Sequence, residues 1–391
     1  PARWALLLRE PAVEGQGGAG FDGGEFSADR IDLGALATLA AQLPLGQALH
    51  KLLAELAPSG EIRGLDGRWD GPIDAPRSYQ FKAQAQGLSI AAAPAAQAQH
   101  IGRPGWRNAT LDIEASEAGG RALLTLDKGA LILPGVFEQP EVAFDAFTTK
   151  VLWRVTAGSG APAAIEVSLA DTQFANADAH GRVAKAVWRS GSGAGFARGG
   201  RFPGRLELNA LLTQGRAAAV ARYLPLGLPE SARRYVQNAV RDGRIAEAKV
   251  SVNGDLFDFP FVPYTLPGER TPVVPEGEFR IAAKAQDVEL AYVPDHDGQA
   301  SPWPVFSRVS GEIVFDRTAM EVRNAQARLW GVELTQVNGG IRELTQPVLK
   351  IEGQARGPAA DLLRYVNASP VAGWTQNALR LKRWPRTWFP V

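Results

Sequence analysis

The segment ARYLPLGLPESARRYVQNAVRDGRIAEAKVSVNGDLFDFPF, residues Ala221–Phe261, is the most informative part of this 391-residue chain. Its pattern predicts a helix, a turn, a second helix that ends at Gly243 as a left-handed cap, and then a strand. The sequence LPLG occurs at Leu43–Gly46 and again at Leu224–Gly227. Each copy precedes a helical segment and a glycine that opens a strand, Gly60 in the first copy and Gly243 in the second. An internal repeat of this length predicts stacked modules rather than one compact core.

A second echo pairs FKAQAQGLSI (Phe81–Ile90) with IAAKAQDVEL (Ile281–Leu290). Helical periodicity is confined to three segments, 33–56, 215–243 and a stretch that begins near Pro358. These features predict six segments. They are a partial module ending in a helix pair (1–58), a β module (59–214), a helix–turn–helix (215–243), a second β module (244–357), the helical start of a further module (358–379) and an atypical basic and aromatic tail (380–391).

Composition excludes several classes of protein. The 45% hydrophobic content argues against wholesale disorder, and the near balance of 42 basic and 41 acidic residues argues against a nucleic-acid surface. The absence of cysteine excludes disulfides and thiolate metal sites. No apolar run is long enough for a membrane-spanning helix. Because the chain begins at Pro1 without a signal peptide, we expect it to be a piece of a longer polypeptide.

Outside the helical segments the sequence alternates with a period of two. Leu111 and Ile113, for example, interleave with Asp112 and Glu114. Because side chains on a strand alternate between faces, one face is expected to be apolar and the other wet. About twenty such strands are expected, too many for the helices to cover. We therefore predict a mostly β fold, an elongated and curved antiparallel-rich sheet forming a trough of repeated modules, with a few short amphipathic helix pairs. The alternative is a pair of stacked β-sandwiches.

The sequence offers little catalytic chemistry. Its four histidines lie in unrelated segments without metal-binding spacing (His50, His100, His180 and His296). Asp295–Gly298 resembles the start of a calcium loop, but Phe306 holds the position of the required glutamate. Gly15–Gly20 has the letters of a phosphate-binding loop, but an extended segment follows it, which indicates a hairpin loop, and Gly191–Gly200 is also expected to be a loop. We expect no enzyme, no metal and no cofactor.

The segment Tyr223–Phe261 resembles the YhdP family of AsmA-like envelope proteins. Members carry a proline-broken helix pair, a glycine, and a strand ending in a sequence like GDLFDFPF. The resemblance covers most of the chain and is strongest from about 200 to 375, where it includes GEFRIAAKAQDVELAYVPD (Gly277–Asp295), Trp303–Pro304, SGEIVFDRTAMEV (Ser310–Val322) and LRYVNASPV (Leu363–Val371). The chain departs from the family pattern in two ways. Its final dozen residues do not fit the pattern, and the membrane anchor expected at the N-terminus is missing.

The resemblance implies a function. Family members are anchored in the inner membrane of Gram-negative bacteria, and their periplasmic part forms a β-trough implicated in moving phospholipid toward the outer membrane. For this chain it implies a periplasmic location, an inner-membrane anchor absent from the chain, phospholipid acyl chains as cargo, a possible outer-membrane or periplasmic partner, and no nucleic acid. Trp106 and Trp303 are expected to occupy comparable places in the two repeats and to anchor the trough wall.

Under this hypothesis the apolar strand residues line the lipid groove. They are Ile113, Leu124, Leu126, Val167, Leu169, Leu206, Leu208, Val250, Val252, Ile281, Val288, Leu290, Ile313, Phe315, Leu329, Leu334 and Ile351. The alternative is a structural or adhesive β-repeat envelope protein. In that case each of these residues would fill a closed core that binds no ligand.

Overall fold

The computed structural model describes residues 3–9, 22–40, 47–72, 76–94, 101–157, 163–191, 203–266, 268–295 and 298–374, with no side chains given for 40, 47–49 and 52. Several sequence predictions fall outside these residues. They concern the first LPLG copy at Leu43–Gly46, the loop at Gly15–Gly20, nearly all of the loop at Gly191–Gly200, His100, His296 and the tail at 380–391.

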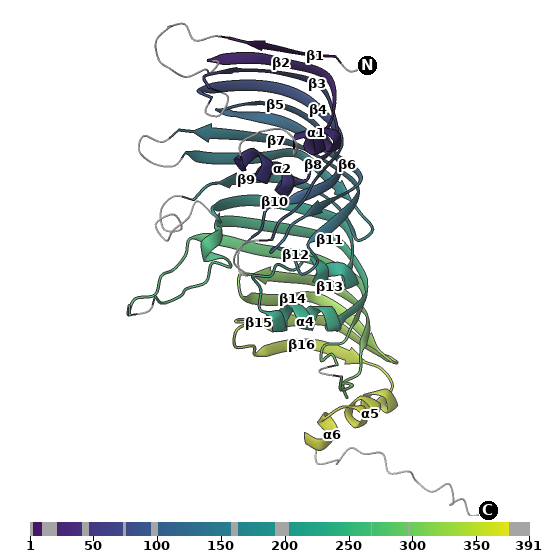
Figure 1. The fold of residues 1–391 in the computed structure, drawn as a ribbon. Coiled ribbons are helices and arrows are strands. Elements are labelled where there is room, and N and C mark those ends of the chain that lie inside the picture. The colour runs from purple at the N-terminus through teal and green to yellow at the C-terminus, as the bar shows by residue number, and fades with distance from the viewer. Residues whose placement is uncertain are drawn as a thin grey trace, which may run out of the picture. The chain divides into compact units, whose positions relative to one another are not determined.

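The described strands form one 16-stranded sheet in which the strand order follows the sequence (Figure 1). Neighbouring strands are antiparallel from β1 to β9 and from β12 to β16. The strands are β1 (Trp4–Leu8), β2 (Gly23–Asp32), β3 (Ser59–Asp70), β4 (Ser78–Ile90), β5 (Gly105–Ser116), β6 (Gly119–Ile132), β7 (Glu141–Thr156), β8 (Ala164–Ala175), β9 (Ala179–Arg189), β10 (Arg205–Arg216), β11 (Val240–Asp255), β12 (Gly277–Leu290), β13 (Phe306–Asp316), β14 (Ala319–Leu329), β15 (Val332–Ile341) and β16 (Leu349–Arg356).

This topology confirms the predicted mostly β fold with an open antiparallel sheet. The alternative of two packed sandwiches is wrong, because the described strands belong to a single sheet whose first and last strands are β1 and β16. The described residues form 16 strands, fewer than the expected number of about twenty. Many strands are long, up to 16 residues in β7 and β11, and contain irregularities that change the phase of the alternation within one strand.

All the described helices except η2 (Leu256–Asp258) lie in the three predicted segments. The helices are α1 (Leu33–Ala40), α2 (Gln47–Leu56), η1 (Ala217–Tyr223), α4 (Glu230–Ala239), η2, α5 (Ala359–Ala368) and α6 (Val371–Trp374). The predicted helix cap at Gly243 is wrong, because α4 ends at Ala239 and Val240 already has extended backbone. Gly243 instead lies inside β11 with φ +116°.

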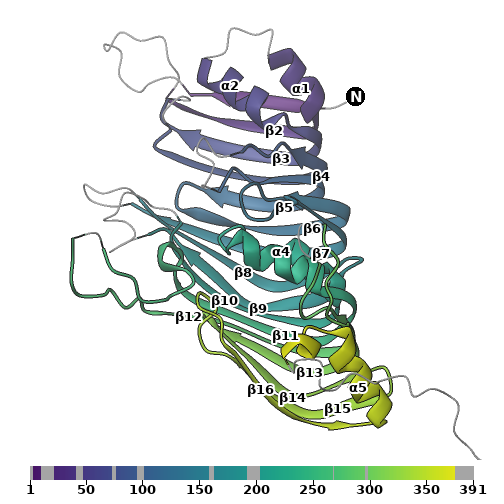
Figure 2. The same cartoon turned by 90° about the horizontal axis from the view of Figure 1, so that it is seen from below.

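Contacts divide the chain into two compact units. Unit 1 comprises Pro1–Thr213, Pro225–Gly227 and Lys249–Phe279, and unit 2 comprises Gln214–Leu224, Leu228–Ala248 and Arg280–Val391. In unit 1, α1 and α2 lie on one face of the strands (Figure 2). In unit 2, α4 is joined to the end of β12 by the Ala291 amide, which donates to the Ala239 carbonyl at 2.8 Å. The six predicted segments remain a prediction.

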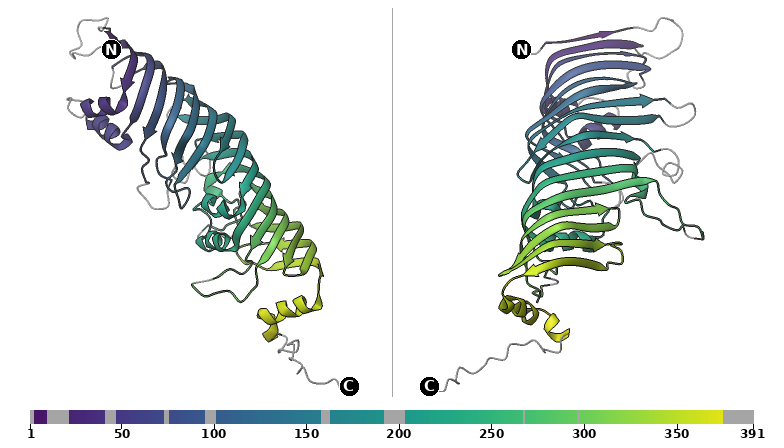
Figure 3. Two further views of the ribbon diagram at one scale, coloured as in Figure 1. Left: turned by 90° about the vertical axis from the view of Figure 1, so that its right-hand side faces the viewer. Right: turned by 180° about the vertical axis from the view of Figure 1, so that it is seen from behind.

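The strands are curved (Figure 3), and most of them carry a β-bulge. Each bulge contains one residue with left-handed backbone. These residues include Gly87, Asn108 and Asp171 in unit 1, and Asp287, Arg308, Asn324 and Gln336 in unit 2. A side chain of the adjacent strand often accepts from the bulge amide, as Ser310 Oγ does from Asp287 N at 3.0 Å. The inserted residue lets apolar side chains before and after it stay on one face.

Candidate functional site

The strand register of unit 1 arranges apolar side chains in rows that cross the sheet from strand to strand. A middle row runs from β4 to β9 and consists of Ala83, Ile113, Ala122, Val151, Leu169 and Ala186. Beside it runs a second row of Ile62, Ala85, Leu111, Leu124 and Thr149. We call the face that carries these rows the apolar face. Its larger side chains in these two rows are half-buried, so part of their surface stays accessible.

A third row closes one edge of the apolar face. This core row contains Leu88, Ala109, Leu126, Phe147, Phe174 and Gly181. Ala109 and Leu126 are 0% exposed, and Leu33 at the start of α1 packs against their cluster. Backbone bonds fix the same edge, since the Ala91 amide donates to the Leu56 carbonyl at the end of α2. We call this edge the helix rim.

The opposite edge, where the β3–β4, β5–β6, β7–β8 and β9–β10 turns lie, carries aromatic side chains, and we call it the turn rim. An aromatic row crosses nine strands there and consists of Leu6, Phe26, Gly67, Phe81, Ala115, Gly120, Trp153, Val167 and Trp188. Trp69 and Tyr79 face each other one step closer to the turns. The aromatic row and the core row are separated by three steps of alternate residues, about 20 Å.

The other face of the sheet is charged. Ion pairs join neighbouring strands across it, including Glu114–Arg121 at 2.7 Å, Lys150–Asp171 at 2.6 Å, Glu166–Arg189 at 2.7 Å and Lys185–Glu207 in unit 1, and Lys284–Glu247 at 3.1 Å and Arg280–Asp316 at 2.9 Å in unit 2. Hydrogen bonds from arginine lower the pKa of Glu61 and of Glu321 on this face. Such exposed pairs contribute little stability individually, but they keep this face wet.

Unit 2 has the same division into two faces. Ile281 pairs with Phe315, and Ala283 pairs with Ile313. The bulge at Asp287 returns Val288 and Leu290 to this face. Its helix rim is closed by aromatic side chains. The Tyr235 hydroxyl donates to the Tyr292 carbonyl at 3.0 Å, and the Tyr292 and Tyr365 hydroxyls lie 3.1 Å apart, while burial raises the pKa of Tyr292.

A family model described as "YhdP protein" matches residues 9–381, which is most of the chain. The chain belongs to the YhdP family. YhdP is an AsmA-like family, so the resemblance that the sequence motifs carried is confirmed. No curated protein and no solved structure matches this YhdP-family chain. Among the described residues, no helix combines the length and the apolar character needed to cross a bilayer.

The YhdP-family chain places the residues predicted to line a groove on the apolar face of each unit. Register assigns five of them in unit 1 (Ile113, Leu124, Leu126, Val167 and Leu169) and eight in unit 2 (Ile281, Val288, Leu290, Ile313, Phe315, Leu329, Leu334 and Ile351). Leu206 and Leu208 flank Glu207, which points to the charged face, and so lie opposite it. Asn253 of β11 accepts a hydrogen bond from Arg205, so it lies on the charged face. Val250 and Val252 alternate with it and therefore lie on the apolar face.

The predicted residues differ in accessibility. Leu126, Val252, Val288 and Leu329 are buried by the protein itself and offer no surface to a ligand in this structure. Ile351 on β16 is 50% exposed, and the others are half-buried. Within the middle and second rows, the accessible surface belongs to the larger aliphatic side chains, because the alanines and Thr149 are buried. Whether lipid contacts these side chains stays a prediction.

Sequence reasoning missed several residues of this face. Val151 and Trp153 were overlooked because Leu152 between them is also apolar, although it points to the charged face and is 46% exposed. The prediction that Trp303 occupies the place of Trp106 in the second repeat was also wrong. Trp106 pairs with Ile90, and the residue that pairs with the equivalent Leu290 is Phe306. A usable signal was Gly120, since its register partner Trp153 lies over it and a Cβ there would be 2.4 Å from the indole.

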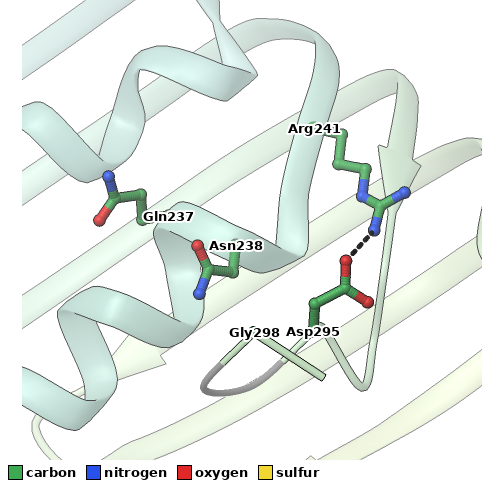
Figure 4. A pocket seen from close by; sticks show the side chains of 5 residues that line it. All are labelled: Gln237, Asn238, Arg241, Asp295 and Gly298. Carbon is green, nitrogen blue, oxygen red and sulfur yellow. Dashed lines mark ion pairs between the residues drawn. The ribbon is translucent and has the colours of Figure 1, made fainter. Parts of the chain in front are cut away.

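Unit 2 also contains a polar cavity. Gln237 and Asn238 of α4, Arg241 of β11, Asp295 and Gly298 line a volume of about 570 Å³ (Figure 4). Arg241 and Asp295 are 3.7 Å apart, and their charges offset each other. The described residues contain no cluster of three or more side chains that could hold a metal ion. The site that the geometry offers is thus the apolar face.

Proposed function

We propose that the apolar face of this chain conducts phospholipid acyl chains through the periplasm between the inner and outer membranes. The observation that carries the proposal is the continuity of the middle row. Register links its six residues across six neighbouring strands without a charged side chain between them. The family match supports the proposal, because AsmA-like envelope proteins resemble bridge-like lipid transporters.

The physics of moving a lipid favours such a surface. Exposing hydrocarbon to water costs about 0.8 kcal/mol per CH₂, which is about 13 kcal/mol for a sixteen-carbon chain. An acyl chain that lies on Ile113, Val151 and Leu169 removes much of that contact with water. The headgroup stays hydrated throughout. Movement along the row needs no bond to form or break, so no catalytic residue takes part.

The cellular setting is part of the same proposal. The protein would act in the periplasm of a Gram-negative bacterium, held at the inner membrane by an anchor outside this chain. A partner at the outer membrane or in the periplasm would receive the lipid. These elements come from family membership.

Two adjacent leucines of β6 allow a matched test. Leu124 lies on the apolar face, whereas Leu123 lies on the charged face and is 45% exposed. A photoreactive amino acid at each position should capture phospholipid in cells only at position 124. Because position 123 is the more exposed, nonspecific capture of lipid would favour position 123 instead. Capture at both positions alike, or at neither, would refute lipid conduction and favour a structural β-repeat protein.

A further inference from the structure

The two rims of the apolar face in unit 1 differ in chemistry, and this difference bears on how a lipid would lie there. The helix rim is closed by packing and by bonds to the backbone, although Arg103 Nε and Trp106 Nε1 are buried there without a hydrogen-bond partner. Leu33 of α1 packs against Leu88 and Leu126, and the Arg103 guanidinium donates to the Glu55 carbonyl at 2.7 Å. A headgroup at this rim would have to displace a core that is already closed.

The turn rim carries amphipathic aromatic side chains. Trp69, Trp153 and Trp188 are half-buried, and each lies against a glycine of an adjacent strand or turn. A Cβ on Gly24 would be 2.5 Å from the Trp69 ring, and one on Gly204 would be 2.8 Å from Trp188 Nε1. The glycines therefore leave the space that the indoles occupy against the sheet.

Tryptophan and tyrosine concentrate where hydrocarbon meets water, because one end of the side chain is apolar and the other forms hydrogen bonds. Beyond these rings the turn rim becomes charged. Arg9 pairs with Asp70 at 2.6 Å, and Arg77 pairs with Asp22 at 3.0 Å. From the middle row toward the turns, the apolar face thus passes from aliphatic to aromatic side chains, and ion pairs lie at the strand ends beyond them.

We propose that a glycerophospholipid on this face is oriented, with its acyl chains on the middle and second rows and its headgroup at the turn rim beside Trp153 and Trp188. The inference rests on the proposed function and adds a direction across the strands. The aromatic row marks the level of the glycerol and ester groups. At the helix rim the bound lipid presents only its acyl chains.

Two photoactivatable phospholipids with the same glycerol backbone test this orientation in the full chain. One carries a diazirine in the headgroup and the other near the end of an acyl chain. Labelled residues are mapped by mass spectrometry. We expect the headgroup probe to label 153–156 and 188–191, and the acyl probe to label 111–113, 122–124 and 149–151. Headgroup labelling at 103–107 or 131–142, or equal labelling of both rims, overturns the orientation while leaving lipid binding intact.

The substitution Trp153→Leu sharpens the test, because it keeps an apolar side chain but removes the indole N–H. Headgroup labelling at the turn rim should fall about threefold, while acyl labelling stays unchanged and reports that the sheet is folded. Unchanged headgroup labelling removes Trp153 from the proposal. Absence of labelling by the acyl probe in the unsubstituted chain contradicts lipid conduction itself, which separates the two failures.

Discussion

The two repeats of the chain share a backbone framework but seal it with different side chains. In the first repeat, Gly60 has φ +113°, and the Ala91 amide donates to the Leu56 carbonyl at 2.8 Å. In the second repeat, Gly243 has φ +116°, and the Ala291 amide donates to Ala239 at the same distance. Strand β4 of the first repeat and β12 of the second also carry equivalent bulges at Gly87 and Asp287.

The sealing side chains, in contrast, differ in polarity. Those of the first repeat are wholly packed apolar groups, leucines together with Phe144 and Phe147, whereas those of the second include tyrosines joined through their hydroxyls. Leu33, Leu88 and Leu126 close the helix rim of the first repeat. Tyr292 and Tyr365, joined through their hydroxyls, close that of the second, where Trp303 packs on Tyr292. Glycines and bulges therefore fix where the helix meets the sheet. The side chains that fill this junction are interchangeable as long as they exclude water.

Substituting the framework glycines should have the largest effect. A Cβ on Gly243 would lie 2.5 Å from Val288 Cα, and one on Gly60 would lie 2.7 Å from the Gly87 carbonyl oxygen. Gly243→Val or Gly60→Val should lower the free energy of unfolding by about 4 kcal/mol, because a backbone clash adds to an unfavourable φ. Gly227 has no atom within 4 Å of a built Cβ, so Gly227→Val is the control in urea unfolding. Similar losses at all three positions would break the comparison.

The second largest effect should be a difference in stability loss between the closed and the accessible parts of the apolar face. Leu126→Ala removes a side chain with 0% exposure and should cost about 3 kcal/mol, because the surrounding core cannot collapse into the cavity. Ile113→Ala, at a half-buried position, should cost about 1 kcal/mol, since water already reaches it. Both values come from chemical denaturation. Equal losses would mean that the middle row is closed as well.

The stability that the aromatic seal gives to the second repeat should depend on pH. In the first repeat, Ala92 holds the position that corresponds to Tyr292. Burial, and then the hydrogen bond with Tyr365, raises the pKa of Tyr292. Its contribution is therefore complete below the unfolded pKa of about 10 and is lost as the pH rises above that value. Tyr292→Phe should cost about 1 kcal/mol at neutral pH and flatten the loss of stability above pH 10, about where tyrosine ordinarily titrates. If Tyr292→Phe lost stability above pH 10 as steeply as the unsubstituted chain, Tyr292 would not be part of the seal.

The charged face should give the smallest effect. Arg189 and Glu166 are 2.7 Å apart, but both side chains are more than one third exposed. Arg189→Ala should change the free energy of unfolding by about 0.5 kcal/mol or less, and salt should reduce even that. A loss above about 2 kcal/mol would show that this face contributes to folding as the helix rim does.

The sequence was sufficient for the fold class and for the face on which each predicted residue lies, because alternation determines sidedness. Ile113 and Leu169 were found in this way. It was not sufficient for accessibility. Leu126 and Leu124 have the same pattern, but only Leu126 is fully buried, in a cluster packed by Leu33 of α1 and by side chains of other strands.

The bulges were also missed, although Asn108, Asp171, Asp287 and Asn324 are residues that tolerate left-handed backbone. Each stands where the alternation changes phase, which is the signal that sequence reasoning could have used. The tryptophans of the turn rim were missed for a different reason. Besides the apolar Leu152 beside Trp153, their common place at one edge follows only from the strand register, which brings Trp69 opposite Gly24 and Trp153 opposite Gly120.

The central claim is that one face of the sheet, and not the other, holds lipid. Val151 and Leu152 are adjacent on β7 and point to opposite faces. The decisive measurement is the phospholipid bound per purified chain, determined by mass spectrometry, for Val151→Asp and Leu152→Asp. The account predicts that Val151→Asp lowers bound phospholipid about tenfold, because a carboxylate in the middle row cannot be desolvated by an acyl chain, while Leu152→Asp leaves it unchanged. Equal lipid content in the two variants would contradict it.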